Sequence, residues 1–450
     1  MSLLTRRRWL IPLAIVVLLA VAGGVLVESN FAAVQAQRTY QGHRHALDAD
    51  LKAAQGQGYT AEDLGPITSR LAQIDSGPAP WWLTSRADFY RHQDQQVVQL
   101  DADLNARQKQ LLEQAEGDTT QQVAAARTGI DRDRDLGADD SDLKPLQQRL
   151  EGIAKVQGAA HTITDFRNAS KQAQALASDV TAVGTAQQAE NQAIAAAAED
   201  LKGQTGGNLD AIRKAGADAL YSGRNDASIA AYLNKSAPFK SFDVLSKAYS
   251  RLEKYGQKLD SGDVNQVALG TGALKRYGAQ VHDALMGNLP ARTIVLSQTA
   301  QQLWAFEGGN QVMTTVVTTG KPPDLITDLG PMKVLSKSSP WKMHSPWPKG
   351  SPYWYPDTEV QMVLWFTNTG EGLHDASWQP CCWGPGSQYS SYASHGCVHV
   401  PVDQERFLFN WAPVGTPVVH YPGDGQPVDK QLAQITTDDQ GNPTTGPKGA

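Results

Sequence analysis

The sequence predicts a multidomain protein with an N-terminal transmembrane anchor, an all-α region of helical repeats and a C-terminal, mainly-β domain. Three observations carry this prediction: an uncharged apolar run at 9–27, apolar side chains at helical spacing over 35–285, and a change to strand-forming and turn-forming residues from 291. The chain has 450 residues, and at about 150 residues per domain this length accommodates two or three domains.

The composition argues against nucleic acid as a partner, and the positions of the cysteines indicate a functional site. Lys and Arg number 40 against 46 Asp and Glu, a formal net charge of -6, so the chain lacks the positive charge by which proteins bind nucleic acids. Its three cysteines, Cys381, Cys382 and Cys397, are too few for a disulfide framework. All three lie within 17 positions of one another, and this clustering indicates a functional site.

The N-terminus has the features of a signal-anchor. Arginines end the basic segment 1–8, and the 19 residues of 9–27 carry no charge, which is long enough for a helix that spans the core of a bilayer. Because basic residues stay in the cytoplasm, we expect 1–8 to be cytoplasmic and the chain after 27 to lie outside the cytoplasmic membrane. The alternative is a cleaved signal peptide, for which Val34-Gln35-Ala36 is a candidate cleavage site.

Residues 35–285 are rich in Ala, Gln, Asp, Leu and Arg at helical spacing and favour long helices. The segment 63–74 is echoed by 142–153 at an offset of 79 residues, and 243–252 is a weaker third copy. In the first two copies an Asp precedes a proline, which favours a helix start by capping and by proline in the first turn. Repeated helical units predict a bundle or small solenoid. We interpret this region as an extracytoplasmic spacer whose protein partners are unknown.

The C-terminal part has a different amino-acid composition. Eight of the 11 tryptophans lie between Trp304 and Trp411, and the Gly, Asn and Pro residues of 286–292 mark the boundary. A hairpin is predicted around Gly308-Gly309-Asn310. The strands expected in this part are 293–296, 302–306, 312–317, 333–336, 360–367 and 416–421. They form one β domain over 291–421, and the polar segment 422–450 is expected to be a disordered tail.

One short segment of the β domain carries a sharp chemical signal. Ser394-His395-Gly396-Cys397-Val398-His399 follows a further histidine, His374, about twenty residues upstream. A cysteine thiol is mostly protonated at neutral pH, so a nucleophilic cysteine needs a base, and an imidazole supplies one. The glycine before the cysteine lets the backbone turn sharply, so that a substrate carbonyl can approach backbone N–H groups. The pattern predicts thiol-based acyl transfer.

This combination resembles the signature of the L,D-transpeptidases, the YkuD-type catalytic domain, whose members cross-link bacterial peptidoglycan through a cysteine. The resemblance covers 291–421 and leaves the helical region outside it. The segments 294–297 and 302–306 are similar to the opening hairpin of that family, and 319–321 to the end of its next strand. The resemblance implies a bacterial cell-wall enzyme that acts on the outer side of the cytoplasmic membrane, with a part in cell wall biogenesis and cell shape.

Carried over to this chain, the resemblance implies Cys397 as the nucleophile and His374 as its general base. The family orients this base through the neighbouring residue or a backbone carbonyl, and Asp375 is the neighbour here. His395, Gly396 and Cys397 would build the oxyanion pocket, with Ser394 as support for that loop. The residues implied for the walls of the substrate groove are His399, Trp354, Tyr353 and Trp378.

The implied reaction is a two-step acyl transfer without a metal or an organic cofactor. The cysteine attacks a tetrapeptide stem, releases D-alanine and passes the acyl group from a thioester to an acceptor amine. Transfer to water would make an L,D-carboxypeptidase, and attachment of a wall protein is a further use of the same site. Carbapenems are the expected covalent inhibitors. One position and one segment depart from the family: His399 stands where Asn or Arg is common, and 327–330 stands in place of a Thr-Pro-x-Gly segment.

Two readings from other classes stay open. Three cysteines and the histidines His374, His395 and His399 are types that bind zinc, although their spacing matches none of the usual zinc patterns. The β domain is alternatively a non-catalytic module that binds cell wall, with the helical repeats as a partner-binding stalk. The pair Cys381-Cys382 could form a vicinal disulfide, stay reduced, or pair with Cys397 and block it.

Overall fold

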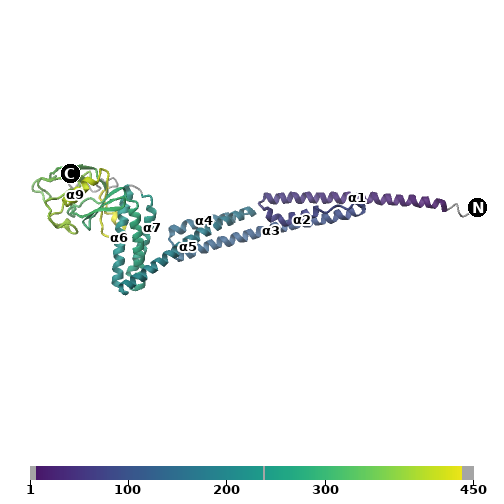
Figure 1. Cartoon of the computed structure of the whole chain (residues 1–450), viewed down its shortest axis with the longest axis horizontal. Helices are drawn as coiled ribbons and strands as arrows, with labels where there is room; N and C mark the ends of the chain where they lie inside the picture. The colour runs from purple at the N-terminus through teal and green to yellow at the C-terminus, as the bar shows by residue number, and fades with distance from the viewer. Residues whose placement is uncertain (1–6, 237–238, 438–450) are drawn as a thin grey trace, which may run out of the picture. The chain divides into compact units, whose positions relative to one another are not determined.

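The computed structural model describes residues 7–236 and 239–437 (Figure 1). The chain divides into two compact units, Met1–Ala189 and Glu190–Ala450. The first unit is all-helical, and the second contains helices and all the strands described below. The prediction of a helical region followed by a C-terminal, mainly-β domain is confirmed.

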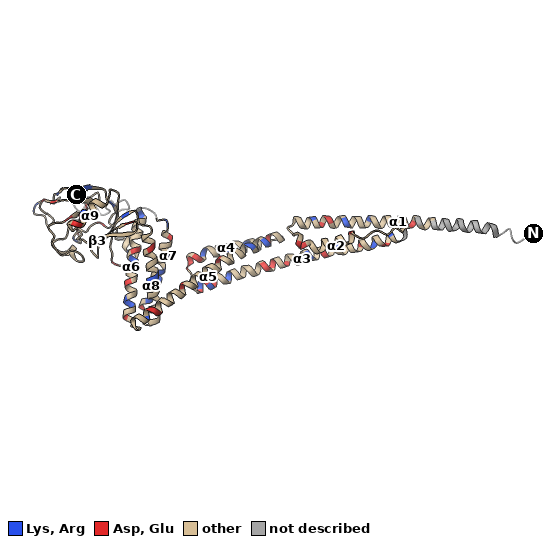
Figure 2. Ribbon diagram, viewed as in Figure 1, with Lys and Arg blue, Asp and Glu red and all other residues tan. Residues whose placement is uncertain are grey.

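The first unit consists of long helices joined by short loops. Its helices are α1 (Arg7–Gly56), α2 (Ala61–Asp75), α3 (Leu83–Asp135), α4 (Asp140–Gly158) and α5 (Ile163–Thr205), the last of which continues into the second unit. The rings of Tyr40 and Tyr90 are 6.0 Å apart, and His43 contacts Asp94, so α1 and α3 run in the same direction and α2 runs back between them. Acidic and basic residues are interspersed along these helices (Figure 2).

The sequence repeat corresponds to the two returning helices, α2 and α4. Each buries an apolar stripe against the longer helices; these stripes are Leu64, Ile67 and Leu71 in α2, and Leu143, Leu146, Leu150 and Ile153 in α4. The expected position of the proline differs from the structure, because Pro66 and Pro145 each lie in the second helical turn. Helix α2 begins earlier because Thr60 and Asp63 form a reciprocal capping box that satisfies its first free N–H groups.

The second unit joins a helical layer to the β domain. Its further helices are α6 (Leu209–Ser236), α7 (Phe242–Gly256), the 3-10 turn η1 (Gln257–Asp260) and α8 (Val264–Met286). One core of this unit combines apolar residues of α6, α7 and α8 with Val295, Val419 and Tyr421 of the sheet. The helices from residue 190 onward therefore pack with the β domain, whereas the sequence analysis assigned them to the spacer.

The first sheet has the strand order β3-β2-β1-β11-β4. Its strands are β1 (Arg292–Ser297), β2 (Gln302–Glu307), β3 (Asn310–Val316), β4 (Gly330–Lys333) and β11 (Pro417–Tyr421). The hairpin of β2 and β3 lies where the sequence predicts it, and Gly308 and Gly309 both have positive φ angles at its turn. Strands β1 and β11 pair in parallel and form the centre of the sheet.

The second sheet has the order β10-β9-β8-β5 and stands beside the two-stranded pair β6-β7. The strands are β5 (Ser336–Ser338), β6 (Trp341–Met343), β7 (Thr358–Val360), β8 (Val363–Trp365), β9 (Gly372–Asp375) and β10 (Val398–Val400), followed by helix α9 (Val402–Trp411). The main β core includes Leu296 and Leu303 of the first sheet with Leu373 and Val398 of the second. This shared core fixes β9 and β10, which carry the chemical motif.

The segment after residue 421 differs from the expected disordered tail. Residues 428–432 form the short helix α10 (Val428–Leu432), and Gln431 and Thr437 are fully buried. Polar composition suggested disorder, but here polar groups of the segment find partners far away in the sequence: the Gln431 carbonyl accepts from the Tyr232 hydroxyl at 2.8 Å, and the Thr437 hydroxyl donates to the Leu329 carbonyl at 2.8 Å. Residues 438–450, the rest of the predicted tail, lie outside the described part of the chain.

Replacing Tyr232 by phenylalanine should loosen this C-terminal segment. The change removes the hydroxyl donor from the buried Gln431 carbonyl, which keeps the backbone N–H of Gln434 at 3.0 Å, so the loss is that of one hydrogen bond, about 0.5–1.5 kcal/mol. We expect faster amide hydrogen exchange at residues 428–437 in Tyr232→Phe than in the unchanged chain. Tyr389→Phe, at an exposed ring of the same unit, is the control, and equal exchange in all three proteins would contradict the docking of α10 on α6.

The predicted membrane anchor is not supported by the helices that the structure describes. Among residues whose side chains are described, no helix is both long enough and apolar enough to cross a bilayer. The anchor predicted at 9–27 falls largely outside those residues, although the backbone of α1 begins at Arg7.

Candidate active site

The residues of the motif meet at two neighbouring strands of the second sheet. Strands β9 and β10 pair in parallel, and the register places His374 opposite His399. Cys397 immediately precedes β10, so the turn before this strand brings the thiol to the edge where His374 lies. Parallel pairing therefore joins two residues that are 23 positions apart in the sequence.

His374 is held in one orientation by the backbone. Its Nδ1 lies 2.9 Å from the carbonyl oxygen of Asp375, and its side chain is 1% exposed. A carbonyl only accepts hydrogen bonds, so Nδ1 carries the proton and Nε2 is the basic nitrogen. Burial lowers the pKa of His374 below its usual value, and the hydrogen bond to Asp375 and the charge of that residue oppose this only in part. The arrangement provides a neutral imidazole base near neutral pH.

The Cys397 thiol is held in its protonated form. Burial, with a smaller contribution from the charge of Glu371, raises its pKa to about 12, and a hydrogen bond from the backbone of Gly372 opposes this only in part. The Sγ atom donates to the Gly370 carbonyl at 3.7 Å. The resting pair is therefore a neutral thiol and a neutral imidazole, and the thiolate forms only when a base removes the proton.

A dense set of hydrogen bonds shapes the loop before Cys397. The Ser394 hydroxyl donates to the Cys397 carbonyl and accepts from the backbone N–H of Gly396 at 3.2 Å. Gly396 has a φ of +129°, and a Cβ at this position would lie 2.9 Å from Oε1 of Glu371. Only glycine fits this turn without strain, so the predicted supporting role of Ser394 and the need for Gly396 both have a geometric basis.

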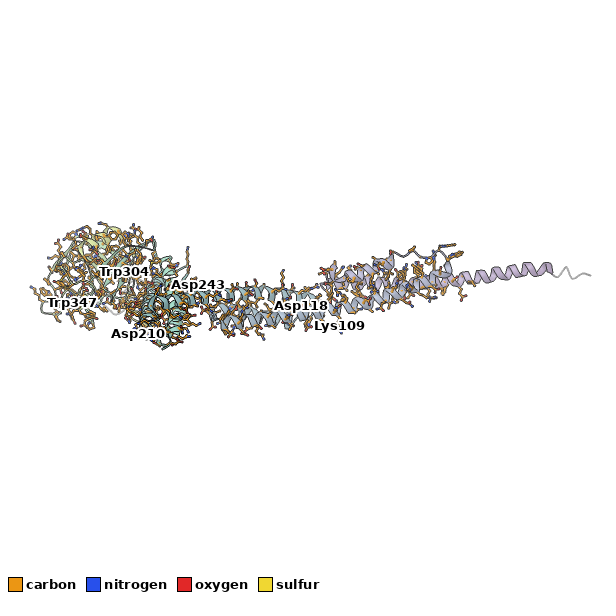
Figure 3. The ribbon with its side chains drawn as sticks, turned by 60° about the horizontal axis from the view of Figure 1, so that its bottom comes forward. Lys109, Asp118, Asp210, Asp243, Trp304 and Trp347 are labelled. Atoms are coloured by element: carbon orange, nitrogen blue, oxygen red, sulfur yellow. The ribbon has the colours of Figure 1, made fainter. Side chains whose placement is uncertain are left out.

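A cavity of about 440 Å³ opens above these residues. Its lining includes Cys397, His374, His395, His399 and Ser394 together with the aromatic side chains Trp347, Tyr355 and Trp378. Trp347, labelled in Figure 3, belongs to the segment between β6 and β7 that covers one side of the cavity. Of the aromatic residues predicted for the groove, Trp378 lines the cavity.

Tyr353 and Trp354 lie outside the cavity lining. The Tyr353 hydroxyl donates to the Asp324 carboxylate at 2.8 Å, and Trp354 lies under the ammonium group of Lys349. Trp347 and Tyr355 form the cavity wall where Tyr353 and Trp354 were expected. All four are aromatic residues of the same segment, and the sequence has no signal that tells the lining residues from the others. The rings of Trp347 and Tyr355 pack on His395, at centroid distances of 5.6 and 4.8 Å.

Three further side chains complete the surroundings of the base. The ring of His399 lies 4.9 Å from that of His374, and its Nδ1 is 3.3 Å from Oε1 of Gln379. The Asp375 carboxylate accepts the backbone N–H groups of Gln361 and Met362, each at 2.8 Å, so this residue orients His374 through its carbonyl rather than its carboxylate. No motif in the sequence indicates Glu371, which lines the cavity and is 5% exposed.

The remaining cysteines do not block the site. Cys381, Cys382 and Cys397 are all free thiols, and the first two are exposed. Within residues 7–236 and 239–437, no group of three or more His, Cys, Asp or Glu side chains is arranged to hold a metal ion. The arrangement of a buried imidazole, a thiol and a shaped cavity is suited to cysteine acyl transfer.

Several solved structures are similar to part of this chain. Three of the similar solved structures are a mutant L,D-transpeptidase of Enterococcus faecium (27% identity, 29% of this chain and 50% of that chain, TM-score 0.26), an L,D-transpeptidase from Mycobacterium smegmatis (24%, 29% and 58%, 0.26) and the catalytic domain of an E. faecium L,D-transpeptidase (26%, 30% and 99%, 0.26). This chain thus spans about half the length of the first of them. The comparison with curated proteins found no match.

The comparison with protein-family models identifies the part of the chain that matches a known family. Residues 291–419 match the YkuD model, described as the L,D-transpeptidase catalytic domain. This range contains the whole cavity and both His374 and Cys397. The resemblance that the motif predicts is therefore confirmed: over residues 291–419, this chain matches the L,D-transpeptidase catalytic domain.

Proposed function

We propose that the β domain is a cysteine acyltransferase that cross-links peptidoglycan stem peptides. The observation that carries this proposal is the pair formed by His374, with its proton fixed on Nδ1, and Cys397 in one cavity at adjacent strand ends. A buried base with a free nitrogen beside a protonated thiol is the arrangement that nucleophilic catalysis requires.

In the first step, Nε2 of His374 takes the thiol proton as Sγ of Cys397 attacks the carbonyl carbon before the terminal D-alanine of a tetrapeptide stem. The negative charge on the carbonyl oxygen is stabilised by backbone N–H groups of the 395–397 loop. The tetrahedral intermediate then breaks its C–N bond, and the imidazolium of His374 returns the proton to the departing amine of D-alanine. A thioester on Cys397 is the product.

In the second step, the amine of a second stem attacks the thioester, and Nε2 of His374 takes the proton that this amine loses. The Cys397 sulfur leaves and is reprotonated by the imidazolium. Among the residues that line the cavity, Glu371 is the one carboxylate, and no Lys or Arg is among them. A carboxylate without a cationic side chain in the same lining favours approach of an ammonium group, and on this basis we propose an amine rather than water as the acceptor.

The proposed location follows from the sequence at the N-terminus. The uncharged run at 9–27 would anchor the chain in the bacterial cytoplasmic membrane, with the helical region and the β domain on the cell-wall side. Peptidoglycan is found there, so the proposed substrate and the proposed location agree. The helical unit would then act as a membrane-attached spacer.

The test is to incubate the full chain in detergent with a tetrapeptide donor and an amine-bearing acceptor stem and to analyse the products by mass spectrometry. We expect loss of one D-alanine per product and a cross-linked dimer. Loss of D-alanine without dimers would make the protein a carboxypeptidase, and an unchanged donor would contradict the proposed reaction. A carbapenem adduct that peptide mapping places on Cys397 would give independent support.

A further inference from the structure

The loop between α2 and α3 exposes two adjacent tryptophans. Trp81 and Trp82 stack at a centroid distance of 3.9 Å, and they are 74% and 61% exposed. We call residues 76–82 the tryptophan loop. Soluble surfaces rarely expose large apolar side chains together unless they serve an interaction, so this pair calls for a partner.

The tryptophan loop is held in place by the helices that it connects. The side chain of Arg86 donates to the Pro80 carbonyl at 2.8 Å, and the side chain of Gln93 donates to the Ile74 carbonyl at 3.0 Å. Two prolines, Pro78 and Pro80, further restrict its backbone. The indole rings are therefore presented by a braced loop.

The tryptophan loop lies at that end of α2 and α3 which is nearer to the apolar run 9–27 of α1. The contacts of Tyr40 with Tyr90 and of His43 with Asp94 set the parallel register of α1 and α3. By this register the first residue of α3, Leu83, is level with about residue 33 of α1. In Figure 1, α1 continues past this level toward the N-terminus, beyond the ends of α2 and α3.

This end of the first unit carries almost no charge. Residues 29–37 of α1 and residues 76–85 contain no Asp, Glu, Lys or Arg. The large apolar side chains that α1 exposes near this level are Val25, Val27, Phe31 and Val34. Beyond the exposed Glu28, Phe31 and Val34 thus carry apolar surface along α1 to the level at which α3 begins.

We propose that the tryptophan loop inserts into the headgroup region of the lipid bilayer and gives the first helical unit a second contact with the membrane. This inference rests on the proposed anchor at 9–27. Trp side chains favour the membrane interface because the ring is apolar and its N–H finds polar partners there. Loop and helix together would define one lipid-facing end.

The dimensions agree with this proposal. The interfacial layer on each side of the hydrocarbon core is about 5–8 Å thick. Level 33 of α1 lies about 9 Å beyond Val27 at 1.5 Å per residue, and Trp82 is the residue immediately before α3. The ring of Trp82 therefore lies at about the outer edge of the interfacial layer when 9–27 spans the core, and the ring of Trp81 stacks on it.

The experiment uses the full chain reconstituted into phosphatidylcholine vesicles with bromine atoms near the headgroup end of the acyl chains. Bromine quenches tryptophan emission only at close range. The emission of Trp81 and Trp82 is obtained as the difference between the unchanged chain and Trp81→Phe/Trp82→Phe. We expect this difference emission to lose most of its intensity in brominated vesicles relative to unbrominated ones. Trp341→Phe, at an exposed tryptophan of the second unit, is the matched control, and its difference emission should be unaffected.

The outcomes separate the loop from the anchor. If the protein floats with the vesicles but the difference emission is unquenched, the lipid contact is wrong and the anchor stands. If, in that case, acrylamide in the water also fails to quench it, the rings are covered by protein, such as a second copy of the chain. If the protein does not float with the vesicles, both the anchor and the lipid contact are wrong, while the proposed acyl transfer is untouched.

Discussion

Replacing Cys397 by alanine is expected to abolish both the release of D-alanine and the formation of a carbapenem adduct. The reason is that a thioester needs a thiol, and of the three cysteines only Cys397 is among the lining residues of the cavity. Intact-mass spectrometry of the full chain after incubation with a carbapenem measures the effect directly. The unchanged protein should gain one inhibitor mass, and Cys397→Ala should gain none.

The chain provides matched controls for this prediction. Cys381→Ala and Cys382→Ala each remove an exposed thiol outside the cavity, so both variants should keep the adduct and the release of D-alanine. A normal adduct in Cys397→Ala, or its loss in Cys381→Ala, would assign the nucleophile to another cysteine. Retained binding of wall peptide by all four proteins without any turnover would favour the non-catalytic binding module.

The sequence predicted those parts of the fold that depend on residues close together in the chain. The hairpin of β2 and β3 was predictable because its glycine turn and alternating strands are local signals. The association of His374 with Cys397 came from the resemblance to a family. In physical terms it depends on the parallel pairing of β9 with β10, and a single sequence carries no local signal for parallel pairing.

Other features depend on contacts between distant segments and were not predictable. Glu371 approaches Gly396 because strand β9 and the loop before β10 lie side by side, and no spacing in the sequence encodes that approach. The polar segment after residue 421 is ordered by distant partners: the Tyr232 hydroxyl, about 200 positions earlier, donates to it, and Val428 and Leu432 pack against the core shared by the helices and the sheet. Composition describes a segment's own tendency, and tertiary partners can override it.

Replacing His374 by glutamine is expected to lower the rate of acylation by about 10²–10⁴, the range associated with loss of a general base. The Cys397 pKa of about 12 leaves very little spontaneous thiolate at neutral pH, so the reaction depends on proton removal by His374. Because burial lowers the pKa of His374, the imidazole stays unprotonated at neutral pH and loses its basic nitrogen only as the pH falls below its usual pKa of about 6.5.

The pH dependence distinguishes a base from a structural residue. Stopped-flow measurement of carbapenem acylation should give a rate that is level near neutral pH in the unchanged protein and falls below about pH 6.5. In His374→Gln this acidic limb should vanish, and the remaining rate should rise with pH as the thiolate forms. His344→Gln changes an exposed histidine outside the cavity lining and should keep both the rate and the limb. An acidic limb that persists in His374→Gln would place the base elsewhere, with His399 as the next residue to test.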